Sequence, residues 1–170
     1  TVAILLVDWE EHLGVGCETN NTYSYYVGDG GMVIVIKDSL NNTVARSDGS
    51  WRAQTFYTAP IKNLSCAFET GYERRSDTCS TLSSNNGQAY YGLHWARPAG
   101  WNLPSFNDSV FPLAHTFTNA TVGVNNKPAY TNFTSIFDDP TDDAQFIWSS
   151  NLILDNEVLV RHTVPAVGTG

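Results

Sequence analysis

The chain of 170 residues suits a single domain, and a domain of this length buries about 70% of its unfolded surface, so folding needs no cofactor. Nine Lys and Arg against 17 Asp and Glu leave a formal net charge of −8, which argues against nucleic acid or an anionic membrane as a partner. Because Lys, Glu and Met are scarce while Val, Thr, Tyr, Phe and Trp abound, the composition favours an all-β fold. No stretch approaches the ~20 apolar residues of a membrane-spanning helix, so no membrane span is expected.

The first predicted element is the apolar run Thr1–Val7, whose lack of alternation fits a strand covered on both faces or a buried segment of undecided type. Residues 8–21 are polar, contain two Gly, and are expected to form a connection. Two strands at 22–27 and 32–37, separated by GDGG, predict a hairpin. The turn DSLNN then leads to a strand at 43–47.

Short strands continue along the rest of the chain. The alternating segment Trp51–Ala59 is expected to end before Pro60, because proline cannot donate a backbone hydrogen bond. The segment ILDNEVLVRHTV is expected to form a tight hairpin around Asp155–Glu157. Further strands are predicted at Asn63–Thr70, Gln88–Ala96, Val110–Thr118, Thr121–Val124 and Gln145–Ser149. The pattern is typical of a β-sandwich or barrel, predicted here as one domain at 10–164 between an apolar strand at 1–9 and a flexible tail at 165–170.

Asn-x-Ser/Thr acceptor motifs for N-linked glycans are unusually frequent. The composition would give about three by chance, and the chain has six. They lie at Asn20, Asn41, Asn63, Asn107, Asn119 and Asn132. N-glycans require an exposed segment of a secreted protein, so the motifs predict a secreted, extracellular protein that carries them. The alternative is that a chain rich in Asn, Ser and Thr contains the motifs by chance.

Three cysteines, Cys17, Cys66 and Cys79, allow three pairings. In a secreted chain two of them should pair. Cys66 and Cys79 are favoured because they flank one loop-like, Ser-rich stretch. The remaining Cys17 is expected to be a small buried side chain, with a free thiol or a bond to another chain as alternatives.

Two segments in the second half of the chain resemble galactose-binding-like jelly-roll sandwiches. PSFNDSVFPLA (Pro104–Ala114) is similar to the x-F-D-D-S-x-W-P-x-A segment of that fold, with Asn107 in place of the first Asp and Phe111 in place of Trp. QFIWSSNLILDNEVLVR (Gln145–Arg161) resembles its closing W-I-W … D-x-V-x-x-R strands, and WRAQTFYTAPI matches loosely. The resemblance implies an all-β fold with a single jelly-roll β-sandwich domain.

Each matched piece has an expected structural role. Phe106 and Phe111 should fill the core, and Phe146 and Trp148 should alternate onto one face of a strand. Asp108, with the neighbouring Ser, should bond backbone N–H groups within its turn. Because this fold carries lectins, enzyme appendages and structural modules alike, the resemblance does not decide the function.

No catalytic residue or enzyme is predicted. The four His lie in separate segments, and no nucleophile, phosphate-loop or zinc motif occurs. Acidic residues around one turn could ligate a structural calcium through their oxygens, although a solvated turn is the simpler interpretation, so no cofactor is expected to be required. These residues are Asp138, Asp139, Asp142 and Asp143.

Aromatic residues near one loop suggest a sugar-binding alternative. Trp95 and Trp101, with the neighbouring pair Tyr90–Tyr91, could stack on a sugar ring, which would make the protein a secreted, lectin-like carbohydrate-binding module. The same side chains could equally form an apolar lid over one end of a sandwich.

The apolar strand suggests self-assembly. Its side chains Val2, Ile4, Leu5, Leu6 and Val7 could complete the sheet of a neighbouring copy, and head-to-tail repetition of that contact makes a linear or helical homopolymer. The strand could instead belong to its own sheet. The arrangement resembles subunits of secreted, glycosylated extracellular fibrils, so the expected function is a structural subunit of a filament or coat. A domain clipped from an enzyme is a further alternative.

Overall fold

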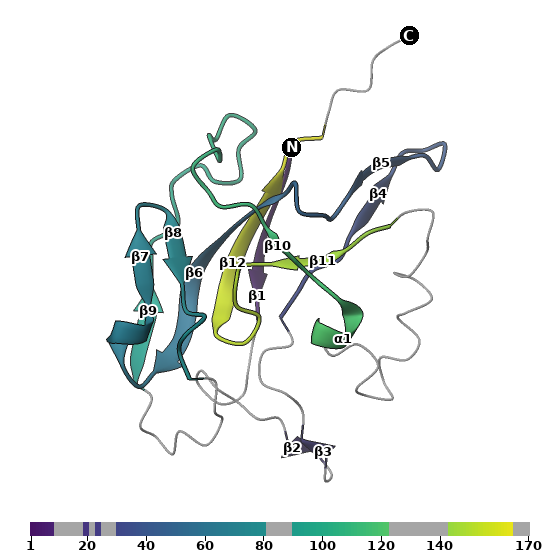
Figure 1. The fold of residues 1–170 in the computed structure, drawn as a ribbon. Helices are drawn as coiled ribbons and strands as arrows, with labels where there is room; N and C mark the ends of the chain where they lie inside the picture. The colour runs from purple at the N-terminus through teal and green to yellow at the C-terminus, as the bar shows by residue number, and fades with distance from the viewer. Residues whose placement is uncertain (9–18, 21–22, 25–29, 81–89, 123–142, 165–170) are drawn as a thin grey trace.

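The computed structural model describes residues 1–8, 19–20, 23–24, 30–80, 90–122 and 143–164. These residues form short β-strands in antiparallel sheets (Figure 1). Among them only a 3-10 turn, η1 (Leu64–Cys66), and one helical turn, α1 (Asn119–Val122), are helical. The predicted all-β class is therefore confirmed. The sheets are compatible with a β-sandwich, and they are small and not closed into a barrel.

The largest sheet has four strands in the order β1, β12, β6, β9, and each strand is antiparallel to its neighbour. Their bounds are β1 (Val2–Val7), β12 (Asp155–His162), β6 (Arg52–Ile61) and β9 (Tyr91–His94). The sheet thus brings β1, near the start of the chain, beside β12, near its end, and β1 shares this sheet with strands of the domain predicted at 10–164.

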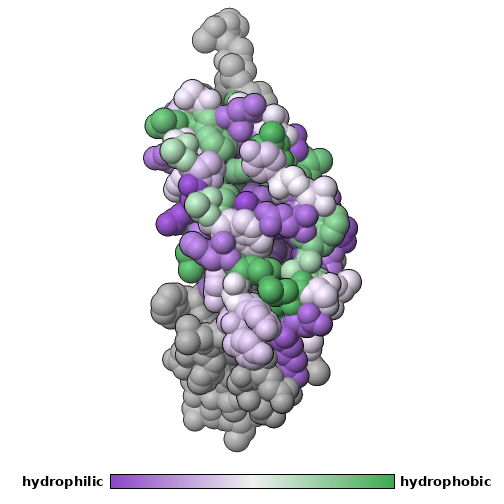
Figure 2. Space-filling model, turned by 90° about the vertical axis from the view of Figure 1, so that its left-hand side faces the viewer, coloured by the Kyte–Doolittle hydropathy of each residue, from purple (hydrophilic) through white to green (hydrophobic). Residues whose placement is uncertain are grey.

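Four two-stranded ribbons surround this sheet. They pair β2 (Thr19–Asn20) with β3 (Tyr23–Ser24), β4 (Val35–Lys37) with β5 (Thr43–Arg46), β7 (Phe68–Thr70) with β8 (Glu73–Arg75), and β10 (His115–Phe117) with β11 (Phe146–Trp148). On the side of the molecule that carries β7, β8 and β9, hydrophobic and hydrophilic residues are intermixed (Figure 2). This face therefore presents no single extended hydrophobic patch among its coloured residues.

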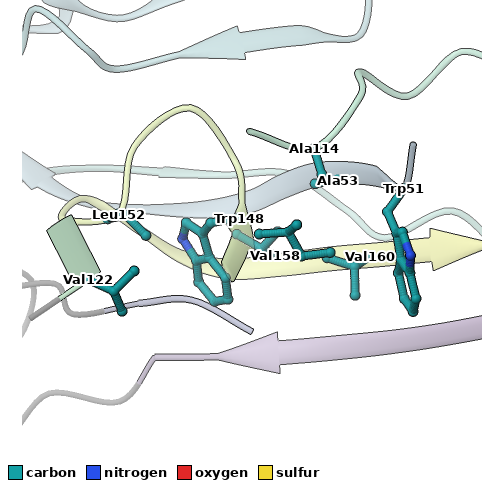
Figure 3. Packing of buried hydrophobic residues seen from close by; sticks show 9 residues of the cluster. Trp51, Ala53, Ala114, Val122, Trp148, Leu152, Val158 and Val160 are labelled. Carbon is teal, nitrogen blue, oxygen red and sulfur yellow. The ribbon is translucent and has the colours of Figure 1, made fainter. Parts of the chain in front are cut away.

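The main hydrophobic cluster lies between the four-stranded sheet and β11. Val158 and Val160 of β12 lie between Trp51 at one end and Trp148 at the other (Figure 3). Because side chains alternate along a strand, the intervening Leu159 points to the opposite face, where it packs with Phe56 and Phe111. The four-stranded sheet is thus covered on both faces.

Several predicted strand boundaries are corrected by the structure. The hairpin predicted between 22–27 and 32–37 is replaced, for the described residues, by separate β2–β3 and β4–β5 ribbons. β6 continues through Pro60 to Ile61, because a register shift between Thr58 and Ile61 removes the need for a proline N–H. The hairpin predicted around Asp155–Glu157 is instead the irregular start of the single strand β12.

Two short segments also differ from the prediction. The predicted strand at Asn63–Thr70 begins as η1, in which the Asn63 side chain caps the turn by accepting from the Ser65 N–H at 3.0 Å. Thr121 and Val122, predicted as a strand, belong to α1 because Thr118 accepts hydrogen bonds from both of their backbone N–H groups. In both segments a local cap provides the backbone partners that a strand would need from a neighbour.

Candidate functional site

The strand β1 is docked along its whole length on β12 (Figure 1). The register runs from Val2 opposite His162 to Val7 opposite Glu157, and the Asp8 N–H continues it by donating to the Asn156 carbonyl at 2.8 Å. Among the described strands, β12 is the only neighbour of β1, so β1 lies at the edge of the sheet. Its outer side presents backbone groups that could pair with another chain.

Both faces of β1 contribute to the core, as the apolar run predicted. Val2, Ile4 and Leu6 pack against the cluster that contains Trp148, whereas Leu5 packs against the opposite cluster. Val7 is 56% exposed and marks the end of the buried part. β1 therefore pairs with β12 in one register and packs against an apolar cluster on each face of the sheet.

The pairing of β1 and β12 occurs within one chain, which is one of the two arrangements expected from the sequence. A donated strand would use the same β12 partner, the same register and the same two clusters, but in a neighbouring copy.

Three of the six acceptor asparagines, Asn41, Asn63 and Asn107, have described side chains, and all three are exposed. Asn41 lies in the turn between β4 and β5 with φ of 67°. Asn63 caps η1, and the Asn107 side chain accepts from the Ser109 N–H at 3.1 Å. Asn20 lies in β2 and Asn119 begins α1, whereas Asn132 is outside the described residues.

Cys66 and Cys79 form the predicted disulfide, with an S–S distance of 2.02 Å and a Cα–Cα distance of 4.9 Å. The bond closes the segment that contains β7 and β8, and both cysteines pack in a small cluster with Ile61 of β6 and Leu154. Cys17 lies outside the described residues.

Asp108 does not act as predicted, because its carboxylate binds a buried arginine and not backbone donors. Arg161 of β12, whose side chain is 1% exposed, donates from Nε to Asp108 Oδ2 at 2.9 Å. Its other guanidinium nitrogens donate to the carbonyls of Trp101 and Leu103, and the group lies over the Phe106 ring. The two segments that resemble the jelly-roll motif thus meet through an ion pair between residues 53 positions apart.

The two tryptophans of the sugar-binding alternative cover a core cluster. Trp95 and Trp101 both pack against the cluster of Phe56, Phe111 and Leu159. The Arg74 guanidinium lies 4.5 Å from the Trp95 ring centroid, and the indole N–H of Trp95 donates to Glu69 at 2.9 Å. One face of Trp95 is therefore occupied by protein.

A network that the sequence did not reveal surrounds Asp155, which has no exposed surface. Its carboxylate accepts hydrogen bonds from the hydroxyls of Ser149 at 2.6 Å, Thr58 at 2.9 Å and Ser76 at 3.2 Å. Asn151 donates in turn to the Ser76 hydroxyl at 2.9 Å. Burial raises the pKa of Asp155 to about 6, although the three hydroxyls oppose the shift. In the sequence Asp155 stands with Glu157 between apolar residues, a pattern that predicts a turn.

The free energy of unfolding should fall by about 2 kcal/mol as the pH rises from about 4 to about 6, because of Asp155. Its folded pKa lies above the ordinary value of 3.8, so between the two values the folded state binds more protons than the unfolded state. Urea denaturation across this range would measure the slope. The uncharged, similarly shaped Asp155→Asn variant should lose this component, and an identical slope in both proteins would contradict the prediction.

The described residues contain no group of three His, Cys, Asp or Glu that could hold a metal ion. Of the acidic turn only Asp143 is described, and the other three candidate calcium ligands, Asp138, Asp139 and Asp142, fall outside the described ranges. Across the part of the chain that the structure describes, no helix has the length and apolar character to cross a membrane. Comparisons with models of protein families, with curated proteins and with solved structures found no match to this chain.

Proposed function

We propose that the protein is a structural subunit of an extracellular, glycosylated filament or coat, built as a jelly-roll type β-sandwich, that assembles head to tail by exchange of β1. The observation that carries this proposal is the position of β1: an edge strand that fits one register on β12 and contributes side chains to both core clusters. Exchange between copies would preserve every one of these contacts, so no strand pairing or core packing would be lost.

Exposed asparagines support the extracellular part of the proposal. Asn41, Asn63 and Asn107 are exposed and lie outside the four-stranded sheet, in turns or caps where a glycan would not interrupt strand pairing. Bulky sugars at such positions would oppose lateral pairing of exposed strand edges and leave the end-to-end contact open. The disulfide is typical of proteins that function in an oxidising compartment.

Cross-linking can distinguish an exchanged strand from one retained in its own chain. Val7 and Glu157 face each other in the register, and opposite residues of antiparallel strands have Cα atoms about 4.5–5.5 Å apart, within the range of a disulfide. Val7 is more than half exposed, and within the described ranges the Glu157 side chain has one ion pair, at 3.7 Å with Arg97, so Val7→Cys and Glu157→Cys should disturb the fold little. With strand exchange, the oxidised double variant should give a ladder of covalent oligomers on a non-reducing gel, and electron microscopy should show filaments.

The matched control combines Val7→Cys with His162→Cys, which the register places at opposite ends of the two strands. This pair should give no ladder. Quantitative cross-linking within single chains, together with discrete particles by microscopy, would exclude strand exchange.

A further inference from the structure

A groove of about 170 Å³ lies between η1, β7 and β9. These elements lie at the edge of the four-stranded sheet that is remote from β1 (Figure 1). Leu93 and Trp95 line the groove on the side of β9, and Leu64 and Phe68 line it on the side of η1 and β7. The wall of the groove is therefore formed largely by apolar side chains.

Two of these apolar side chains are open to solvent. Leu64 is 47% exposed and Phe68 is 51% exposed. Phe68 lies opposite Arg75 in the pairing of β7 with β8, so a charged side chain stands next to the exposed ring. Removing apolar surface from water is favourable, so a group that covers both Leu64 and Phe68 would stabilise the fold.

A possible attachment point for a glycan lies directly beside these side chains. Asn63 is exposed and immediately precedes Leu64. Its amide oxygen accepts from the Ser65 N–H at 3.0 Å, and its backbone carbonyl accepts from the Cys66 N–H at 3.3 Å. Because an N-glycan is attached through the amide nitrogen, the capping bond and a glycan can be present together. The disulfide from Cys66 to Cys79 holds this turn, so the glycan would start from a fixed position at the edge of the groove.

The chemistry of the groove matches N-acetylglucosamine, the first sugar of an N-glycan. The ring has C–H groups and the N-acetyl group has a methyl, and both pack favourably against an aromatic side chain. The hydroxyl and amide groups of the sugar need polar partners, and the half-exposed side chains of Glu69 and Arg75 also line the groove. The volume is below the ~300–1,000 Å³ of sites for drug-sized molecules, so it suits one ring and not a branched chain.

We propose that the first sugar of a glycan on Asn63 packs into this groove, with its C–H groups against Leu64 and Phe68. Its polar groups meet Glu69 and Arg75 at the rim. The sugar then acts as a part of the fold, because it covers apolar surface that the described residues leave open. This inference rests on the N-glycosylation included in the proposed function, and it gives one glycan a role in the stability of the domain.

Loss of the acceptor motif tests the proposal on protein secreted by a glycosylating host. Ser65→Ala abolishes glycosylation at Asn63 and keeps the backbone N–H that Asn63 caps, so the melting temperature should fall by about 2–4 °C. The matched control is Ser109→Ala, which abolishes glycosylation at Asn107. The Asn107 side chain accepts from the Ser109 N–H in the same way, but no residue adjacent to Asn107 lines the groove, so the melting temperature should fall by less than about 1 °C.

A double-mutant cycle tests whether the sugar contacts Phe68. Phe68→Ala should lower the melting temperature of the glycosylated protein, but should cause little further loss in Ser65→Ala, because without the sugar the ring is half exposed. An endoglycosidase that leaves a single sugar on each asparagine should not change the melting temperature, whereas removal of the whole glycan should lower it as Ser65→Ala does. Nuclear Overhauser contacts between the Phe68 ring and the sugar on Asn63 would show the packing directly.

The inference is overturned if mass spectrometry finds Asn63 without a glycan, if Ser65→Ala and Ser109→Ala melt at the same temperature, or if Phe68→Ala has the same effect with and without the sugar. A glycan missing from Asn63 alone leaves the extracellular role in place, whereas glycans missing from every acceptor site would overturn that role as well. All of these variants retain β1, so the comparisons hold whether or not copies exchange that strand.

Discussion

Removing Thr1–Asp8 is expected to abolish filament formation and to lower the free energy of unfolding by several kcal/mol. A fully buried Val, Ile or Leu contributes about 1.5–3 kcal/mol, and four half-buried residues of β1 contribute on the order of 4 kcal/mol before the hydrogen bonds to β12 are counted. Those residues are Val2, Ile4, Leu5 and Leu6. The loss is a large part of the ~5–15 kcal/mol that stabilises a typical domain.

Adding the peptide TVAILLVD to the truncated protein should restore the lost stability, because the groove along β12 is complementary to it. The expected result is a higher melting temperature and a soluble particle that stays monomeric, since the peptide occupies the groove without linking copies. A matched peptide with Ile4→Ser and Leu6→Ser keeps the backbone bonds but loses two contacts with the main cluster, so it should rescue much less.

The truncated and full-length proteins together decide whether β1 is exchanged between copies or stays in its own chain. If filaments form without Thr1–Asp8, the exchange of β1 is not the assembly contact. If the full-length protein is folded and monomeric at high concentration, the strand stays in its own chain.

Asp108→Ala is expected to cost about 3–5 kcal/mol, because it leaves the buried guanidinium of Arg161 without its carboxylate. The carbonyls of Trp101 and Leu103 would remain as partners, but neither carries a charge. Urea denaturation would measure the change. Asp108→Asn, which keeps an acceptor oxygen at the same position, should cost less, and both variants retain the acceptor motif at Asn107.

A double variant distinguishes the cost of leaving the Arg161 charge unpaired from the cost of losing its contact with Asp108. Asp108→Ala combined with Arg161→Met removes both charges, so it should be less destabilising than the sum of the single changes. A cost below about 1 kcal/mol for Asp108→Ala alone would show that this ion pair is not a main tie between β12 and the loop before β10.

Properties that depend on composition or on residues close together in the sequence could be predicted from the sequence. The abundance of Val, Thr and aromatic residues indicated the all-β class, and the disulfide followed from a loop that places Cys66 and Cys79 close together. The apolar run at Thr1–Val7 indicated a strand covered on both faces, because no alternation of polar residues marks a solvent-facing side.

Strand partners and buried polar contacts were decided by the tertiary structure. Thr58 and Asp155 meet although they are 97 residues apart, and a carboxylate in a strand has the same local pattern as one in a turn. The sequence predicts that Asp108 bonds within its own turn, because backbone donors are always near in sequence, whereas its actual partner, Arg161, comes from the remote strand β12. The sequence therefore determined which residues favour strands and which are apolar. Packing determined the pairing, because register is set by the fit of remote side chains on a shared face.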